Sequence, residues 1–230
     1  MSHAILRRVS EGRDPETLRI HRPGAILAFG PKDRLAPGFG EAVQIARDQG
    51  FGAVMRLAGG RAAVFHEQTI AFSWAVPDPQ PRLRIRARFD EVAGLMAEAL
   101  RDLGIDARVG EVPREYCPGE HSVNARGKTK LVGVGQRVVL GAAHVGGVVV
   151  VGGSDLVRDV LVPVYRALEL EWDPATAGSL EDEVPGLSWE DAEAAILRRF
   201  AARDELVEAD LPSEALALAR SLEPRHTVSA

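Results

Sequence analysis

Short stretches of the chain alternate apolar and polar residues, with the period of two that is typical of β-strands. Residues 18–22 (Leu-Arg-Ile-His-Arg) alternate in this way, and an apolar run follows at 25–29 after Pro23 and Gly24. This punctuation predicts two strands connected as in a hairpin. Further short strands are expected at residues 54–57, 62–65, 69–76 and 107–109.

Longer segments carry apolar residues at the spacing of an amphipathic helix. They span about residues 39–49, 89–103 and 154–168, and a further one begins near Trp189. Ser188 and Asp191 form a capping-box pattern at the start of this last helix. Pro163 lies inside the segment 154–168, so we expect it to kink that helix or to split it in two.

Two valine-rich runs, 137–140 and 145–151, are separated by Gly141-Ala142-Ala143, which predicts a β-hairpin in the middle of a sheet. Strands come in clusters between long helices and do not alternate strictly with them. The pattern therefore favours an α+β fold in which mixed or antiparallel β-sheets pack against helices. We expect residues 1–230 to form a single catalytic domain with a short helical C-terminal extension from about residue 186. The tail beyond about Asp210 is weakly specified.

The composition is that of an ordinary globular protein, with 46% hydrophobic and 27% charged residues. The net charge of -5 argues against a general nucleic-acid or membrane-surface binder and favours small-molecule or protein substrates. Cys117 is the only cysteine, so no disulfide can form within the chain. No apolar run approaches the roughly 18 residues of a membrane span, and the N-terminus lacks the apolar core of a signal peptide. We therefore expect a cytoplasmic protein.

Candidate chemistry is concentrated in three segments. In the first, Arg56 precedes the double glycine Gly59-Gly60, where backbone N–H groups can approach an acyl carbonyl or a phosphate, although a plain tight turn looks the same. In the second, Cys117 stands beside a Pro-Gly pair and is followed by His121 and several cations. Nearby positive charge favours a reactive thiolate, although a lone cysteine can equally be an inert space-filler.

The third segment, residues 127–137, brings a lysine into a strand of small residues, although a basic surface hairpin would share this pattern. Taken in order, the three segments resemble the superfamily of lipoate-protein ligases, biotin ligases and octanoyltransferases, and the likeness runs from about residue 19 to 199. Arg56-Leu57-Ala58-Gly59-Gly60 matches an Arg-x-x-Gly-Gly motif, and Lys130-Leu131-Val132-Gly133 matches a downstream Gly-Lys-Lys-[Ile/Phe]-x-Gly-like motif. Tyr116-Cys117-Pro118-Gly119 looks most like the octanoyl amidotransferase branch, in which the cysteine is the nucleophile.

This resemblance implies a fold like the catalytic domain of biotin and lipoate ligases, and an acyltransferase activity. A cysteine thiolate would attack the thioester of an acylated carrier and hold the octanoyl or lipoyl group until a lysine of a lipoyl-domain protein displaces it. Cys117 would be the nucleophile, and Lys130 would contact the acyl carbonyl. The implied substrate-binding residues are Arg56, Gly59, Gly60, His66, Gly133 and His144. His121 is the better alternative base, and the valine-rich hairpin offers an apolar wall for the acyl chain.

The transferase interpretation requires no cofactor and no metal. Its expected partners are an acyl-carrier or glycine-cleavage-H-type lipoyl protein and the lipoyl domains of 2-oxoacid dehydrogenases. It involves neither nucleic acid nor a membrane.

The chain departs from the superfamily pattern in several places, one of them Thr69-Ile70, where many members have a Gly-Asn pair. Arg61 stands where many members have a third glycine, and Thr129 separates two lysines that the motif places side by side, so Lys128 is an alternative to Lys130 as the functional lysine. Two other functions therefore stay open: an ATP-dependent lipoate-protein ligase that uses ATP and Mg²⁺, with Cys117 incidental, and an inactive carrier-binding homologue. The Gly-Arg-Gly-Arg pattern of biotin ligases is absent, which makes biotin the less expected substrate.

Overall fold

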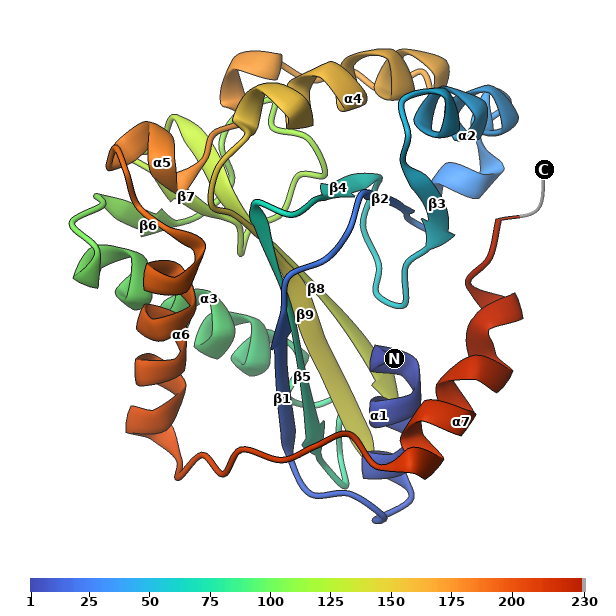
Figure 1. Cartoon of the computed structure of the whole chain (residues 1–230), viewed down its shortest axis with the longest axis vertical. Helices are drawn as coiled ribbons and strands as arrows, with labels where there is room; N and C mark the ends of the chain where they lie inside the picture. Colours follow the sequence, from blue (N-terminus) through green and yellow to red (C-terminus); the bar gives the residue numbers. More distant parts are fainter. Residues whose placement is uncertain (229–230) are drawn as a thin grey trace.

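The computed structural model describes residues 1–228 and contains two β-sheets that are covered by helices (Figure 1). The larger sheet has six antiparallel strands, in the order β1 (Thr17–His21), β5 (Thr69–Pro77), β9 (Ala142–Val150), β8 (Thr129–Val139), β7 (Val123–Ala125) and β6 (Ala107–Val109). The smaller sheet has the order β3 (Gly52–Met55), β2 (Ile26–Phe29) and β4 (Ala63–Phe65). In this sheet β2 runs parallel to β3 and antiparallel to β4.

The helices are α1 (Ser2–Ser10), α2 (Phe39–Asp48), α3 (Ile85–Asp102), α4 (Ser154–Ala167), α5 (Leu180–Glu183), α6 (Trp189–Arg203) and α7 (Ser213–Leu222). Helices α3 and α6 pack together against the larger sheet, and α2 and α4 bury the apolar face of the smaller one. Helix α1 lies against β5 and β9, and α7 packs on α1 (Figure 1). Across the part of the chain that the structure describes, no helix combines the length and the apolar composition needed to span a bilayer.

The structure confirms the predicted α+β fold with antiparallel and mixed sheets. The segment 39–49 forms α2, and the segment 89–103 lies in α3, which begins one turn earlier at Ile85. The capping box of α6 is formed as expected, because the Ser188 hydroxyl accepts the N–H of Asp191 and the Asp191 carboxylate accepts the N–H of Ser188, both at 3.1 Å. The assignment of residues 1–230 to one catalytic domain stays a prediction.

The hairpin expected at residues 18–29 is wrong, because its two strands belong to different sheets. Strand β1 pairs with β5 at the edge of the larger sheet, whereas β2 is the central strand of the smaller one. Leu27 and Phe29 of β2 are both 0% exposed, in the core beneath α2 and α4. Pro23 and Gly24 mark a change of chain direction, but tertiary packing decides which strands pair.

Two other expectations differ from the structure in detail. The valine-rich hairpin turns more tightly than predicted, at Leu140-Gly141, because β8 and β9 extend to both sides of this pair. Of the two outcomes expected at Pro163, a kink or a split, the split is wrong, because α4 runs without a break. Proline has no backbone N–H, so the helix lacks one internal hydrogen bond at this position. Packing of the buried apolar face of α4 stabilises the helix in spite of this loss. Helices α1, α5 and α7 and strand β7 were not expected from the sequence pattern.

The contact between β8 and β9 requires a glycine at position 147. A Cβ on Gly147 would lie 1.8 Å from the carbonyl oxygen of Gly133. Gly147→Ala is therefore expected to lower the free energy of unfolding by about 1–3 kcal/mol, because the two strands must move apart. Gly94→Ala is the control, since a Cβ at this position in α3 meets nothing within 4 Å and alanine favours the helix. Urea unfolding measures both; a Gly147→Ala protein as stable as the wild type would contradict the prediction.

Candidate active site

A cavity of about 490 Å³ lies where the smaller sheet meets β8 and β9 of the larger one. Its wall is formed by the loop after β3, the loop before β7, the strands β4, β8 and β9, and the first turns of α3. Several residues singled out in the sequence line it: Arg56, Gly59, Gly60, Cys117, Lys130 and Gly133. The three motif segments, which are far apart in the sequence, therefore meet in one place.

Cys117 is half-buried in this cavity, and its sulfur faces two N–H donors. The backbone N–H of Arg61 donates to Sγ at 3.1 Å, and the Arg56 guanidinium (Nη1) lies 3.7 Å from Sγ. Cys117 has a φ of 43°, in the left-handed region that few non-glycine residues adopt and that is enriched at functional sites. Donors of this kind are suited to hold a thiolate.

A glycine is required opposite the sulfur. A Cβ on Gly60 would lie 2.8 Å from Cys117 Sγ and 2.9 Å from the Arg56 guanidinium, and the φ of Gly60 is 106°. The second glycine of the motif therefore allows the turn to approach the thiol closely.

The backbone of Cys117 is anchored from the opposite side by Tyr165 of α4. The N–H of Cys117 donates to the Tyr165 hydroxyl at 2.9 Å, and that hydroxyl donates to the carbonyl of Ala62, also at 2.9 Å. Burial, with a smaller contribution from Cys117, raises the pKa of Tyr165 well above its usual value, so the hydroxyl keeps the proton that it donates. The cysteine loop is thereby tied to the turn that faces its sulfur.

Lys130 holds the cysteine loop through a buried ion pair with Glu115. Its Nζ donates to Glu115 Oε1 at 2.9 Å, to the carbonyl of Tyr116 at 3.0 Å and to the carbonyl of Cys117 at 2.7 Å. The Lys130 and Glu115 side chains are only 1% and 0% exposed. An ammonium has three N–H donors, so all of them are in use. Contact between Lys130 and an acyl carbonyl would require one of these bonds to be exchanged.

Arg61, at the position where a third glycine is common, also contributes to the site. Its guanidinium donates to Asp33 Oδ1 at 3.2 Å, and Asp33 Oδ2 accepts the N–H of Gly30 at 2.8 Å. Asp33 is fully buried, and burial raises its pKa, although Gly30 and Arg61 oppose this shift. A Cβ on Gly30 would lie 1.7 Å from the carbonyl oxygen of Gly60, so this small-residue contact holds the turn in place.

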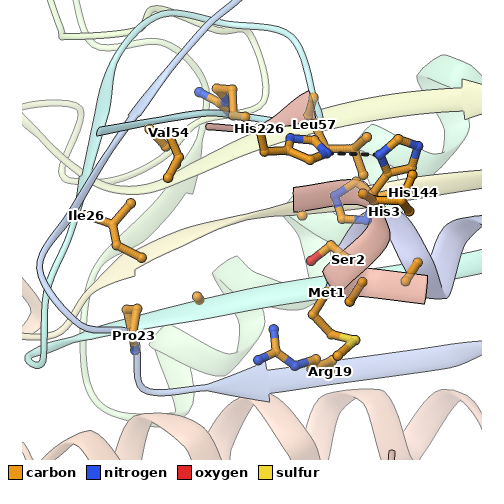
Figure 2. Close-up of a pocket in the computed structure, with 18 of the residues that line it drawn as sticks. Met1, Ser2, His3, Arg19, Pro23, Ile26, Val54, Leu57, His144 and His226 are labelled. Carbon is orange, nitrogen blue, oxygen red and sulfur yellow. Dashed lines mark hydrogen bonds between the residues drawn. The ribbon is translucent and has the colours of Figure 1, made fainter. Parts of the chain in front are cut away.

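A second cavity, of about 560 Å³, is shown in Figure 2. The two share Arg56, Phe65 and Gly147 in their walls. Beyond that point the second cavity is bounded by α1, β1 and the edge of the smaller sheet, and by residues that follow α6. Apolar side chains such as Ile26 and Val54 project into it (Figure 2).

The other candidate residues lie away from the sulfur. His144 lines the second cavity, where its Nδ1 is 3.1 Å from Ser73 Oγ; burial and the charge of Arg56 lower its pKa to about 4, so it is neutral near pH 7. His66 is buried beside Gly153 and lines neither cavity. Burial lowers the pKa of His66 also.

Lys128 is exposed in the turn between β7 and β8, away from the wall of either cavity. His121 lies at the rim of the first cavity, where its ring stacks on Phe89 and Nε2 is 2.8 Å from Asp90 Oδ1. Of the two lysines, it is Lys130 that the fold places beside the cysteine loop. Most valines of the β8–β9 hairpin are core residues, so the hairpin is mainly structural.

Sequence reasoning missed three residues of the site. Glu115 carried a usable signal, since it directly precedes Tyr116-Cys117 in a segment already rich in cations. Asp33 and Tyr165 carried none, because they come from distant segments and reach the site only through tertiary packing.

The sequence and the fold are similar to known acyl-transfer proteins. Residues 1–201 match the model of the lipoyl protein ligase A/B catalytic domain. An octanoyl-[GcvH]:protein N-octanoyltransferase from Geobacillus kaustophilus is 29% identical over 165 residues, which cover 72% of this chain and 58% of the relative. A lipoyl-[GcvH]:protein N-lipoyltransferase from Listeria monocytogenes is 25% identical over 188 residues, 77% of this chain and 67% of the relative.

This chain therefore spans a little over half the length of the Geobacillus relative. Among solved structures, Ta0514 from T. acidophilum with bound lipoic acid superimposes with a TM-score of 0.76 at 21% identity, over 97% of this chain and 88% of that one. The agreement shows that the two chains share a fold and confirms the predicted likeness to lipoate-ligase catalytic domains.

The buried pair predicts how the site responds when its cation is removed. Lys130→Ala leaves the Glu115 carboxylate buried without its counter-charge, which is expected to lower the free energy of unfolding by about 3–5 kcal/mol. Lys130→Met combined with Glu115→Gln removes both charges and should be distinctly more stable than the single variant. Urea denaturation of the two proteins decides: a Lys130→Ala protein with wild-type stability would show that the ammonium does not hold the cysteine loop.

Proposed function

The chain belongs to the lipoyl protein ligase A/B catalytic-domain family, and from this premise we propose that it transfers an octanoyl or lipoyl group from an acylated carrier protein to a lysine of a lipoyl-domain protein. The arrangement around Cys117 carries the proposal, because its sulfur faces the Arg61 N–H and the Arg56 guanidinium in a cavity. The names of the curated relatives support a carrier of the GcvH type.

The proposed reaction has two steps that pass through the cysteine. In the first, Cys117 Sγ attacks the acyl carbonyl carbon; a new C–S bond forms, the bond to the carrier breaks, and the carrier group leaves with the proton from the thiol. In the second, the amine of the acceptor lysine attacks the thioester carbonyl, an amide forms, and the thiol of Cys117 is restored with a proton from the amine. Splitting one acyl transfer into two in this way lowers the individual barriers.

The side chains around the sulfur have distinct proposed roles. Arg56 and the Arg61 N–H stabilise the thiolate and then lie beside the carbonyl oxygen on which negative charge develops. Lys130 donates hydrogen bonds to the carbonyl groups of Tyr116 and Cys117. These bonds stabilise the left-handed backbone conformation of Cys117. If Lys130 exchanged one of its three hydrogen bonds for a bond to the acyl carbonyl, its ammonium would become a further charged donor to that oxygen.

The acyl chain has a natural place in the second cavity. The two cavities share Arg56, Phe65 and Gly147 in their walls, and in the proposed complex a chain attached to Cys117 extends past these residues toward apolar side chains such as Ile26 and Val54. Each buried methylene stabilises such a complex by about 0.8 kcal/mol. His144, neutral at the wall of this cavity, presents no charge to the chain.

A ligase would use the same cavity differently. Lys130 and the Gly59-Gly60 turn would then contact an acyl-adenylate, and Arg56 and Arg86 are the cavity's guanidinium groups that could meet its phosphate. The three donors of Lys130 are already engaged, and Arg56 lies against the cysteine sulfur. These contacts favour the transferase, in which the thiol has a role.

Cys117 is expected to become acylated when an octanoyl thioester donor, such as octanoylated acyl-carrier protein, is supplied. Intact-protein mass spectrometry should show a gain of one octanoyl group that neutral hydroxylamine removes, because hydroxylamine cleaves thioesters. Cys117→Ala, in a chain with no other cysteine, should show no gain. Full transfer activity in Cys117→Ala would refute the proposed nucleophile.

Transfer from octanoyl-GcvH to a lipoyl domain is expected to proceed without ATP and in the presence of EDTA. The donor acyl group is already attached through a bond that the cysteine can attack, so no adenylate is needed. The measurement is the mass of the lipoyl domain with and without ATP and Mg²⁺. Strict dependence on ATP, with release of AMP when free lipoate is the donor, would assign the chain to the ligases instead.

A further inference from the structure

The segment 204–228, which we call the strap, lies beyond residue 201, where the family match ends. It leaves α6 as an extended stretch, crosses the molecule, and forms α7 next to α1 (Figure 1). The strap forms one wall of the second cavity, through Leu216, Ala219, Arg220, Leu222, Glu223 and His226. Part of the cavity that we assign to the acyl chain is therefore built from residues outside the matched catalytic domain.

The strap is fastened to the edge of the smaller sheet. The N–H of Met55 donates to the carbonyl of His226 at 2.7 Å, and the imidazole Nδ1 of His226 lies 2.8 Å from the Met55 carbonyl. Thr227 forms an antiparallel bridge with Val54 of β3. On the other side, His226 Nε2 is 2.9 Å from His3 Nδ1 of α1 (Figure 2). These bonds give the wall a defined position.

One face of α7 is turned to the cavity. Ala219 and Arg220 lie three and four residues after Leu216, which places all three on one side of α7, and Glu223 follows at the end of the helix. Leu216 is a large apolar side chain that is 41% exposed, and an acyl chain in the cavity would cover it. Ala217, on another side of the same helix, is exposed and does not line the cavity.

We propose that the strap determines the length of the acyl chain that the protein accepts, with Leu216 and Ala219 as the specificity-determining residues. This inference rests on the proposed acyl transfer and on the route of the chain into the second cavity. The apolar side chains of this wall, Leu216, Ala219 and Leu222, would strengthen binding by about fourfold for each methylene that they cover. Filling the space at Ala219 should therefore penalise long chains and spare short ones.

Ala219→Trp and Ala217→Trp test the inference as a matched pair, because they make the same substitution on two sides of one helix. The rates of Cys117 acylation by octanoyl and butyryl thioesters of N-acetylcysteamine give an octanoyl-to-butyryl ratio for each protein. Ala219→Trp is expected to lower this ratio about sixteenfold, the equivalent of two lost methylenes. Ala217→Trp should keep the wild-type ratio. An unchanged ratio in Ala219→Trp, or an equal fall in Ala217→Trp, would overturn the inference.

A binding measurement separates this inference from the proposed function. If the wild type is acylated by neither thioester, the transferase proposal fails. Calorimetric titration still measures the affinity of the protein for octanoate. The inference then requires weaker octanoate binding in Ala219→Trp than in Ala217→Trp, and equal binding overturns it. Point substitutions are preferable to deletion of the strap, because deletion would also remove the bonds to Met55, the neighbour of Arg56.

Discussion

The buried ion pair between Lys130 and Glu115 is the contact on which the rest of the candidate site depends. Glu115 also accepts hydrogen bonds from the Ser122 hydroxyl and from the backbone N–H groups of Val112 and Gly119. One carboxylate therefore connects several parts of the loop around Cys117. Lys130 connects this loop to β8 in the larger sheet. Removal of one charge from a buried pair lowers the stability of the fold far more than removal of both, because the remaining charge is then buried without a partner. The fold therefore requires the two side chains to stay together, which fixes the position of the loop.

The second constraint is close backbone approach on the opposite side of the sulfur. Gly30 and Gly60 let β2 and the turn after β3 pack together, and this contact directs the Arg61 N–H at Cys117 Sγ. The loop and the turn are then joined by Tyr165, which contacts the backbone of both. The surroundings of the Cys117 sulfur thus depend on three separate parts of the fold, and the second cavity shares Arg56, Phe65 and Gly147 with the first.

The sequence was sufficient to predict the fold class and to single out motif residues that the fold brings together. Cys117, Lys130 and the Gly59-Gly60 turn lie in short segments with recognisable patterns, and they do meet in one cavity. Strand pairing was not predictable from Pro23-Gly24, because burial under α2 and α4 places β2 in its own sheet. Tyr165 was also beyond prediction, since its contact with Cys117 spans 48 residues of sequence and exists only after α4 has packed.

Cys117, held by this arrangement, is proposed to carry the acyl group between two proteins, and a pulse–chase experiment is the most direct test of this role. Protein acylated on Cys117 with isotopically labelled octanoate is isolated and mixed rapidly with a lipoyl domain, and label on the domain is followed over time. If Cys117 carries the acyl group, the label passes from Cys117 to the acceptor lysine at a rate no slower than steady-state turnover. Label that stays on the protein, or that moves more slowly than turnover, would contradict it.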